Sequence, residues 1–239
     1  MVRRERNGAV CRVTLDRPAR RNALTPAALR ELRAAVEETD APVVCLRGEG
    51  PAFCAGADLD VVADLDREGA REFAELGQDV ARTLETDESV VVAAVDGPAR
   101  GGGVELALAC DLRVATPEAT FAETGVRLGL FGAWGGTARL PRVVGEGVAA
   151  DLTLSGRTVD AETALSWGLV SRVVEEPEAV AHEVADAPAS TLRRLGALLS
   201  PPDGDDDGEA DRPAQERREA DAFADLVAKH GAAIRDERG

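Results

Sequence analysis

Long apolar runs are missing from this 239-residue chain. No stretch approaches the roughly 20 apolar residues that a membrane-spanning helix needs. Residues 1–5 lead into a strand-like pattern rather than into the apolar segment of a signal peptide. We therefore expect a soluble, cytoplasmic protein with no membrane partner.

Histidine is scarce and cysteine is scattered. The chain has two histidines, His182 and His230, and its four cysteines contain no CxxC pair. This pattern excludes a readable zinc site and a readable disulfide framework, so we expect no metal. The simplest interpretation is four reduced, mostly buried thiols. They are Cys11, Cys45, Cys54 and Cys110.

Positive charge is also in short supply, and Lys229 is the only lysine. The chain carries 44 acidic and 28 basic residues, for a formal net charge of −16. Such a surface repels nucleic acid, which argues against a nucleic-acid partner. An acidic, lysine-poor surface is typical of proteins in a high-salt cytoplasm, where charge is screened over about 3 Å at 1 M salt. The alternative is an ordinary acidic soluble protein.

Short apolar runs alternate with helical patterns along the first 199 residues. Thr25 and Pro26 suit the cap and first position of a helix whose Leu29, Leu32 and Val36 share one face. The alternation favours an α/β fold with crossover connections. We predict strands at 10–15, 43–46, 90–95 and 112–115, and further helices at 67–86, 145–154, 160–167 and 178–199.

The C-terminal part differs in composition from the rest. We expect one main domain over 1–199, a solvated acidic linker over 200–213 and a C-terminal helix over 214–239. The last segment spaces its apolar residues as an amphipathic helix that needs something to pack on. These residues are Phe223, Leu226, Val227 and Ile234.

Two glycine-containing turns, at 53–59 and 97–103, follow predicted strands. Glycine lets the backbone approach a ligand closely, and the N–H groups that open a helix point outward as donors. Two such donors on one thioester oxygen would make an oxyanion hole. Turns of this kind also bind phosphates or merely reverse the chain. A short apolar helix follows the second turn and ends near Asp111.

Four ordered motifs carry a more specific signal. They are RPARRNAL at 17–24, AFCAGADL at 52–59, GGGVELALACD at 101–111 and ALSWGLV at 164–170. Together they resemble the successive signatures of the crotonase superfamily, the enoyl-CoA hydratase/isomerase family. The resemblance implies a crotonase-type α/β fold, a spiral of ββα repeats followed by a C-terminal helical region that builds homotrimers or hexamers.

The resemblance also implies roles for individual residues. The N–H groups of Ala57 and Gly102 would form the oxyanion hole. Glu105 matches the first of the two glutamates with which hydratases position and deprotonate water. The alternative is that Glu105 is a carboxylate that only interacts with the dipole at a helix N-terminus.

Coenzyme A is implied as part of the substrate, with no tightly bound cofactor. The loop from Ala55 to Asp60 would line the CoA channel, and Arg21 stands where relatives often place a basic residue near the CoA phosphates. The implied contact residues are Arg21, Ala23, Ala55, Ala57, Asp58, Leu59, Asp60 and Gly102. The sequence has no tyrosine, so no C-terminal tyrosine role carries over.

One departure from the hydratase pattern bears on the reaction. The second glutamate is expected at position 125, where this chain has Gly125. Two carboxylates let one act as base toward water while the other delivers a proton to the α-carbon. Glu123 is close in sequence, but side chains two residues apart normally point in different directions.

Residues 121–136 also resemble the matching stretch of dihydroxynaphthoyl-CoA synthases, some of which carry glycine at this position and recruit bicarbonate as a base. The match fails elsewhere. Gly132 stands in place of an aspartate, Thr153 in place of a tryptophan and Glu123 in place of a glutamine, and those enzymes lack Glu105.

Three hypotheses follow. The first is an enzyme that stabilises a thioester enolate, with hydration of a 2-enoyl-CoA as its reaction. The second keeps the fold but changes the reaction to isomerisation, decarboxylation or thioester hydrolysis, which Gly125 favours. The third is a non-catalytic acyl-CoA-binding protein.

Overall fold

A six-stranded sheet forms the centre of the molecule. The computed structural model describes residues 1–199 and 212–236. The strand order is β1-β2-β3-β4-β6-β9; β1 and β2 are antiparallel and the other neighbours are parallel. The strands are β1 (Val2–Asn7), β2 (Val10–Leu15), β3 (Val43–Gly48), β4 (Val90–Val95), β6 (Leu112–Ala115) and β9 (Arg172–Val173). The four predicted strands are confirmed, and β1 and β9 are additional.

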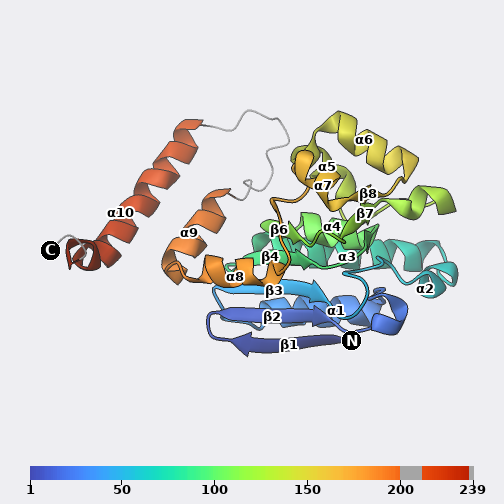
Figure 1. Cartoon of the computed structure of the whole chain (residues 1–239), viewed down its shortest axis with the longest axis horizontal. Coiled ribbons are helices and arrows are strands. Elements are labelled where there is room, and N and C mark those ends of the chain that lie inside the picture. Colours follow the sequence, from blue (N-terminus) through green and yellow to red (C-terminus); the bar gives the residue numbers. More distant parts are fainter. Residues whose placement is uncertain (200–211, 237–239) are drawn as a thin grey trace.

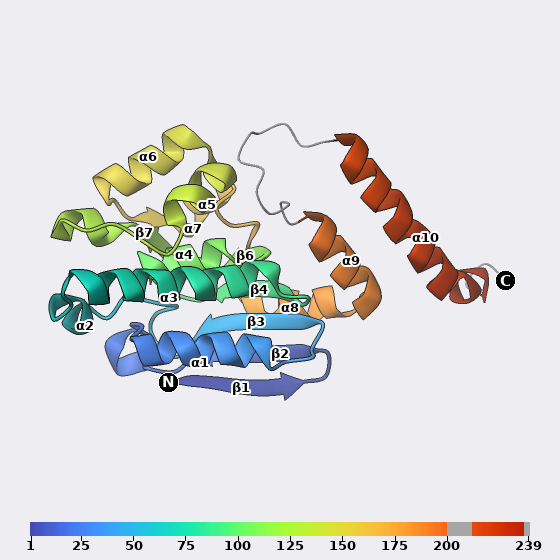
Figure 2. The same cartoon turned by 180° about the vertical axis from the view of Figure 1, so that it is seen from behind.

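Both faces of this sheet are buried over β2, β3 and β4, and alternate residues of these strands supply the two faces. In β3, Val44 and Leu46 join one apolar cluster while Val43 and Cys45 join the other. Helices α1 (Pro26–Glu37) and α3 (Arg67–Thr86) lie in front of the sheet in Figure 2. Helix α8 (Pro177–Ala185) packs on the opposite cluster through Val180 and Ala181.

The predicted start of α1 is confirmed. Thr25 accepts a hydrogen bond from the Ala28 N–H, and Pro26 opens the helix. Leu29, Leu32 and Val36 are buried as their spacing predicts. The predicted helix at 67–86 matches α3.

A second, three-stranded sheet lies beside the first. It contains β5 (Ala99–Arg100), β7 (Thr120–Ala122) and β8 (Val159–Asp160). The segments around it form two 3-10 turns and five helices. They are η1 (Pro18–Arg20), η2 (Thr124–Leu128), α2 (Leu59–Ala63), α4 (Gly102–Leu108), α5 (Gly136–Val144), α6 (Glu146–Ser155) and α7 (Ala161–Ser166). Helix α5 was not among the predicted helices.

The single helix predicted over 178–199 is wrong. The structure has α8, a break at 186–188, and then α9 (Ala189–Leu199). Pro188 explains the break, because it lacks an N–H and disfavours a helical conformation in the residue before it.

The C-terminal helix α10 (Arg212–Asp236) packs on α9 and projects away from the sheet (Figure 1). Gln215 donates a hydrogen bond to the Leu198 carbonyl, and Arg194 pairs with Asp225. Phe223 remains 71% exposed. The predicted acidic linker over 200–213 falls almost wholly on residues 200–211, which lie outside the described ranges.

All four cysteines are free and buried, as predicted. Burial raises the pKa of Cys54 to about 12, so this thiol stays protonated. No helix in the described ranges is both long and apolar enough to cross a bilayer. Residues 1–199 and 212–236 also contain no cluster of acidic, cysteine or histidine side chains that could hold a metal ion.

Candidate active site

An apolar cavity of about 310 Å³ lies between α2, α3, the start of α4 and the segment from η2 to Trp134. Glu105 is the one ionisable side chain among the described residues of its lining. Most of the remaining lining is hydrocarbon or backbone. Its larger apolar members are Leu59, Phe73, Leu128, Leu130, Phe131 and Trp134.

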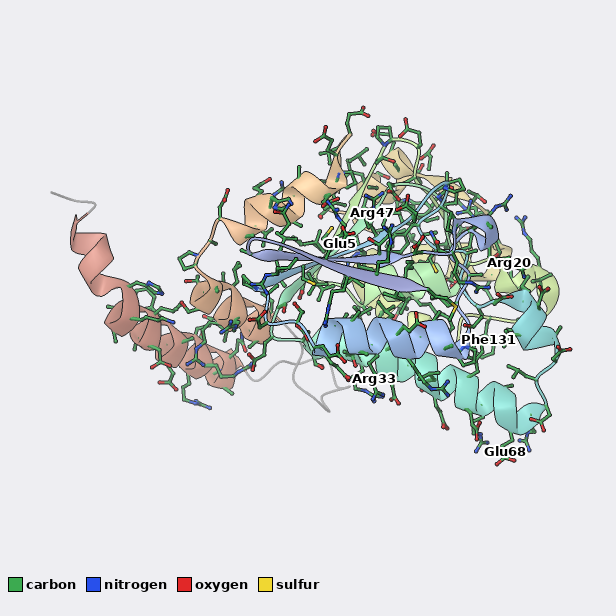
Figure 3. The ribbon with its side chains drawn as sticks, turned by 90° about the horizontal axis from the view of Figure 1, so that it is seen from below. Glu5, Arg20, Arg33, Arg47, Glu68 and Phe131 are labelled. Atoms are coloured by element: carbon green, nitrogen blue, oxygen red, sulfur yellow. The ribbon has the colours of Figure 1, made fainter. Side chains whose placement is uncertain are left out.

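Several of these apolar side chains are exposed at the rim of the cavity. Phe131 is 68% exposed, Leu128 58% and Leu59 54%. Figure 3 shows Phe131 at the same end of the molecule as Arg20, opposite α10. A ligand that enters here would cover apolar surface that water now contacts.

The two glycine-containing turns meet at one wall of the cavity. The Arg100 N–H donates to the Cys54 carbonyl at 2.9 Å. A Cβ atom on Gly56, whose φ is +83°, would lie 2.6 Å from the Arg100 carbonyl oxygen and 2.9 Å from the Gly102 nitrogen. Only glycine permits this contact.

The convergence leaves two backbone donors at the cavity. Ala57 and Gly102 both line it. Within the described part of the chain, neither N–H donates to a protein acceptor. The predicted pair of donors is therefore brought together and left free for a ligand oxygen.

Asn22 fixes the turn that carries Ala57, a role that the sequence did not reveal. It is 1% exposed and has a φ of +58°. Its side-chain amide donates to the carbonyls of Ala52 at 2.7 Å and Glu49 at 3.0 Å, and its Oδ1 accepts from the Arg17 N–H at 2.9 Å. Its place in the RNAL motif was the available signal.

Glu105 is held by backbone donors from a distant loop. Its Oε1 accepts from the N–H groups of Trp134 at 2.9 Å and Gly136 at 2.7 Å. Burial raises the pKa of Glu105, and the two N–H donors partly oppose that rise. The carboxylate is thus oriented, desolvated and disposed to take a proton.

Glycines make room for this carboxylate. A Cβ atom on Gly132 would lie 2.7 Å from the Glu105 Oε2, and one on Gly136 would lie 2.8 Å from its Oε1. Any side chain at either position would therefore displace the carboxylate. The glycine at position 132, where the synthases carry an aspartate, therefore has a role of its own: the absence of a side chain leaves room for Glu105.

Trp134 packs against the turn at 97–103, which carries Gly102. Its indole packs edge-to-face on Phe73 with ring centroids 5.7 Å apart. A Cβ atom on Gly77 or Gly102 would lie within 2.2 Å of the indole ring. The ring therefore fits between α3 and the start of α4 only because both positions are glycine.

Glu123 directly follows β7 and is 6% exposed. Its Oε1 has no hydrogen-bond partner within the described ranges. Burial and the nearby charge of Glu105 raise the pKa of Glu123 to about 8. A carboxyl group in this setting is mostly protonated at neutral pH.

Gly125 lines the cavity and contributes no side chain to it. A Cβ atom here would lie 3.2 Å from the Phe131 Cα and 3.3 Å from the Leu130 carbonyl oxygen. These contacts are tight, so a side chain at this position would need a small shift of the 130–131 backbone.

The residues expected to contact coenzyme A divide into two groups. Ala55, Ala57, Leu59 and Gly102 line the cavity. The remaining four, Arg21, Ala23, Asp58 and Asp60, do not.

The aspartates of this second group bind arginines. Asp58 is 3% exposed and pairs with Arg17 at 3.0 Å and Arg20 at 3.1 Å. It also caps α2 by accepting from the Asp60 N–H at 3.2 Å. Asp60 pairs with Arg20 at the surface. The geometry therefore gives Asp58 a structural task.

Ala23 and Arg21 belong to the segment that supports the turn at 53–59, which carries Ala57. The Ala23 carbonyl accepts from Arg17 at 2.6 Å, and the Arg21 carbonyl accepts from the Ala55 N–H at 2.9 Å. The Arg21 side chain is exposed, and its charge together with burial lowers the pKa of Arg100. Arg21 and Arg100 therefore place two cationic groups near the turn at 53–59.

Comparison with known proteins shows which sequences this chain resembles. The family model described as Enoyl-CoA hydratase/isomerase matches residues 5–195. The chain is 40% identical over 189 residues to a short-chain-enoyl-CoA hydratase of Clostridium acetobutylicum, covering 76% of this chain and 72% of that protein. It is 38% identical over 216 residues to a crotonyl-CoA hydratase of Syntrophomonas wolfei, covering 87% and 83%.

Solved structures agree with the sequence comparison. The crystal structure of an enoyl-CoA hydratase from Bacillus anthracis superposes with a TM-score of 0.88 at 30% identity, covering 99% of this chain and 96% of that one. The predicted crotonase-type α/β fold is confirmed by this match.

Proposed function

This chain belongs to the enoyl-CoA hydratase/isomerase family, and we propose that it adds water across the C2–C3 double bond of a 2-enoyl-CoA thioester. One observation carries the proposal. A buried, oriented carboxylate, Glu105, shares an apolar cavity with the N–H groups of Ala57 and Gly102, which have no protein acceptor among the described residues. A base beside two converging donors is what addition to a conjugated thioester requires.

The chemistry follows from these three groups. The thioester oxygen accepts hydrogen bonds from the Ala57 and Gly102 N–H groups. Glu105 takes a proton from water, the oxygen of that water bonds to C3, and the π electrons move onto the thioester oxygen as an enolate. Each oxyanion donor typically contributes about 10²–10³ in rate. Protonation at C2 completes the addition.

A second reaction on the same site is favoured by Gly125. With no carboxylate at that position, a single proton-transfer group would suffice for isomerisation, decarboxylation or thioester hydrolysis.

The test is a product assay on the purified full-length chain in molar KCl, with crotonyl-CoA and a medium-chain 2-enoyl-CoA as substrates. The expected result is loss of the conjugated thioester absorbance and a product heavier by one water. Glu105→Gln removes the proposed base and should lose activity. Glu118→Gln, on an exposed loop, is its matched control. An isomer, carbon dioxide or free CoA as product would replace hydration with the second reaction, and binding without any product would indicate an acyl-CoA-binding protein.

We further propose how the rest of the substrate and the assembly are arranged. The Arg21 side chain binds the CoA phosphates and Leu59 covers the pantetheine, with no resident cofactor. Residues 1–199 form the core domain, and α10 joins copies of the chain into a trimer or hexamer. The exposed Phe223 supports this role for α10. Light scattering in molar KCl tests it, and a monomer would contradict it.

The acidic, lysine-poor composition supports a high-salt cytoplasm as the working environment. The corresponding test is activity against KCl concentration. The proposal requires activity to rise toward molar salt, whereas a maximum at low salt would contradict it.

A further inference from the structure

Glu123 is a buried carboxyl group that the reaction as described leaves unused. It is 6% exposed, and its Oε1 has no hydrogen-bond partner within residues 1–199 and 212–236. Leaving a buried polar atom unpaired destabilises a fold. A buried acid without a partner is therefore a feature that function, rather than stability, has to explain.

Its position ties it to the cavity. Thr124 and Gly125, the next two residues, both line the cavity that Glu105 shares. Gly125 places only backbone there, and the loop atoms nearest its side-chain position lie at 3.2 to 3.3 Å. Glu123 itself is not among the lining residues, so a proton that it supplies to the cavity needs a relay.

The charged groups on neighbouring elements do not neutralise Glu123. On β5, Arg100 donates to the Thr120 carbonyl and hydroxyl. On η2, Arg127 is exposed, and on β8, Asp160 caps α7 by accepting from the Thr163 N–H. On α7, Glu162 is exposed as well.

The arginines on the neighbouring helices of the described chain have other partners. Arg157, which follows α6, pairs with Asp151 of that helix. Arg139 of α5 pairs with Glu85, and its charge partly opposes the rise that burial causes in the pKa of Glu105. Glu105 is the charge that acts on Glu123, and it acts against ionisation. The two carboxyls differ in that Glu105 has two N–H donors, whereas the Glu123 Oε1 has no hydrogen-bond partner among the described residues.

We propose that Glu123 is the acid of this pair and supplies the proton that C2 of the enolate receives, through a water molecule in the cavity that Thr124 and Gly125 line. This inference rests on the proposed hydration. It gives this chain a second proton-transfer group from a different position of the same loop, in place of a carboxylate at 125.

The step balances in protons and electrons. Glu105 gains the proton that water loses, and the hydroxyl oxygen forms its bond to C3. The enolate pair at C2 then takes a proton from the relaying water, which is replenished from the Glu123 O–H. Afterward Glu105 returns its proton to Glu123, and the net change is the addition of one water. One acid and one base are present before and after turnover.

The experiment compares wild type with Glu123→Gln, and with Glu118→Gln as the control. Crotonyl-CoA hydration is measured from pH 6 to 9.5, and deuterium uptake at C2 of butyryl-CoA in D₂O is followed by NMR. Glutamine keeps the size of the side chain but holds no transferable proton. We expect kcat to fall by about 10²-fold, KM to change little, and deuterium uptake at C2 to be lost.

The pH profile separates proton donation from a structural role. In the wild type, kcat declines above a pH of about 8 as Glu123 ionises, and this decline disappears in Glu123→Gln. As a second variant, Gly125→Glu in the Glu123→Gln background restores kcat at least tenfold, since general acids typically contribute about 10²-fold or more.

Each outcome decides the proposal. A Glu123→Gln enzyme with wild-type kcat, C2 exchange and pH profile overturns it. So does a folded variant whose activity loss leaves the alkaline decline and the C2 exchange intact. If wild type itself fails to hydrate any enoyl-CoA, the proposed function fails first, and C2 exchange by wild type but not by Glu123→Gln still tests the acid role separately.

Discussion

Glu105 and Glu123 are two buried glutamates whose surroundings differ: Glu105 lines the cavity, whereas Glu123 directly precedes the lining residues Thr124 and Gly125. Glu105 is 1% exposed and receives two backbone N–H donors, from Trp134 and Gly136. Glu123 is 6% exposed, and its Oε1 receives none within the described ranges. Burial raises the pKa of both.

The difference shows that burial alone does not decide the protonation state of a carboxyl group. Hydrogen bonds to the charged form favour ionisation, and a nearby negative charge opposes it. Glu105 has the donors and Glu123 has the opposing charge. The titration of such a pair belongs to both groups together, and the N–H donors of Trp134 and Gly136 favour the charged form of Glu105 over that of Glu123.

Removing the charged member of the pair should have the largest effect. Glu105→Gln deletes the base but keeps the side-chain volume, so we expect kcat for crotonyl-CoA to fall by about 10³-fold or more. Steady-state kinetics with Glu118→Gln as control measure this. If Glu105→Gln retained a tenth of the activity, the base would have to be another group.

Displacing Glu105 without removing it sharpens the same comparison. In Gly132→Ala the new methyl group would lie 2.7 Å from the carboxylate. A misplacement on the order of 1 Å costs roughly 10²-fold in rate. Gly147→Ala is the matched control, because its methyl group meets nothing within 4 Å. Equal activity in the two variants would show that the exact place of the carboxylate is unimportant.

The other member of the pair should control how stability depends on pH. Between the unfolded pKa of Glu, 4.5, and the folded value of about 8, the native state keeps a proton that the unfolded chain loses. The free energy of unfolding therefore falls as pH rises, by about 1.4 kcal/mol per unit at most, and becomes level above the folded pKa.

Urea unfolding of wild type and Glu123→Gln at pH 5, 7 and 8.5 tests that slope. Glu123→Gln lacks this contribution, so its stability relative to wild type should improve by a few kcal/mol between pH 5 and 8.5. Parallel pH dependences of the two proteins would mean that Glu123 ionises normally in the fold.

The smallest effect on activity is expected from the Trp134 side chain. The backbone N–H of Trp134, not its indole, binds Glu105. Trp134→Phe should therefore change kcat by less than about threefold, while the gap left between Gly77 and Gly102 should lower stability by about 2 kcal/mol. Thermal unfolding and kinetics on one preparation measure both. A large loss of kcat with unchanged stability would assign the indole a direct role.

Local sequence signals predicted the individual elements well. Thr25 and Pro26 marked the start of α1 because capping and the fixed proline φ act over one turn. The apolar run at 90–95 predicted β4 because both of its faces are buried. The helix over 178–199 was wrong, although Pro188 was a local signal that could have divided it.

The sequence also identified the members of the site but not all their tasks. The two glycine turns and Glu105 were predicted to converge, and the structure brings them to one cavity. Asp58 was assigned to coenzyme A, whereas the structure pairs it with Arg17 and Arg20 from a segment about 40 positions earlier in the chain. Such pairings depend on which loops meet, and no local pattern encodes them.

By itself the sequence determined the alternation of strands and helices, the glycines that permit close backbone contacts, and the missing carboxylate at Gly125. These follow from propensity, periodicity and the absence of a Cβ atom, which are properties of single residues and their near neighbours. Tertiary structure alone decided that Gly132 and Gly136 leave room for Glu105 and that Asn22 holds the turn at 53–59. It also decided that Glu123 is buried and that its Oε1 has no hydrogen-bond partner among the described residues. Burial, donor geometry and the pKa of a carboxyl depend on atoms far away in the chain, so they come into existence only when the fold assembles those atoms around it.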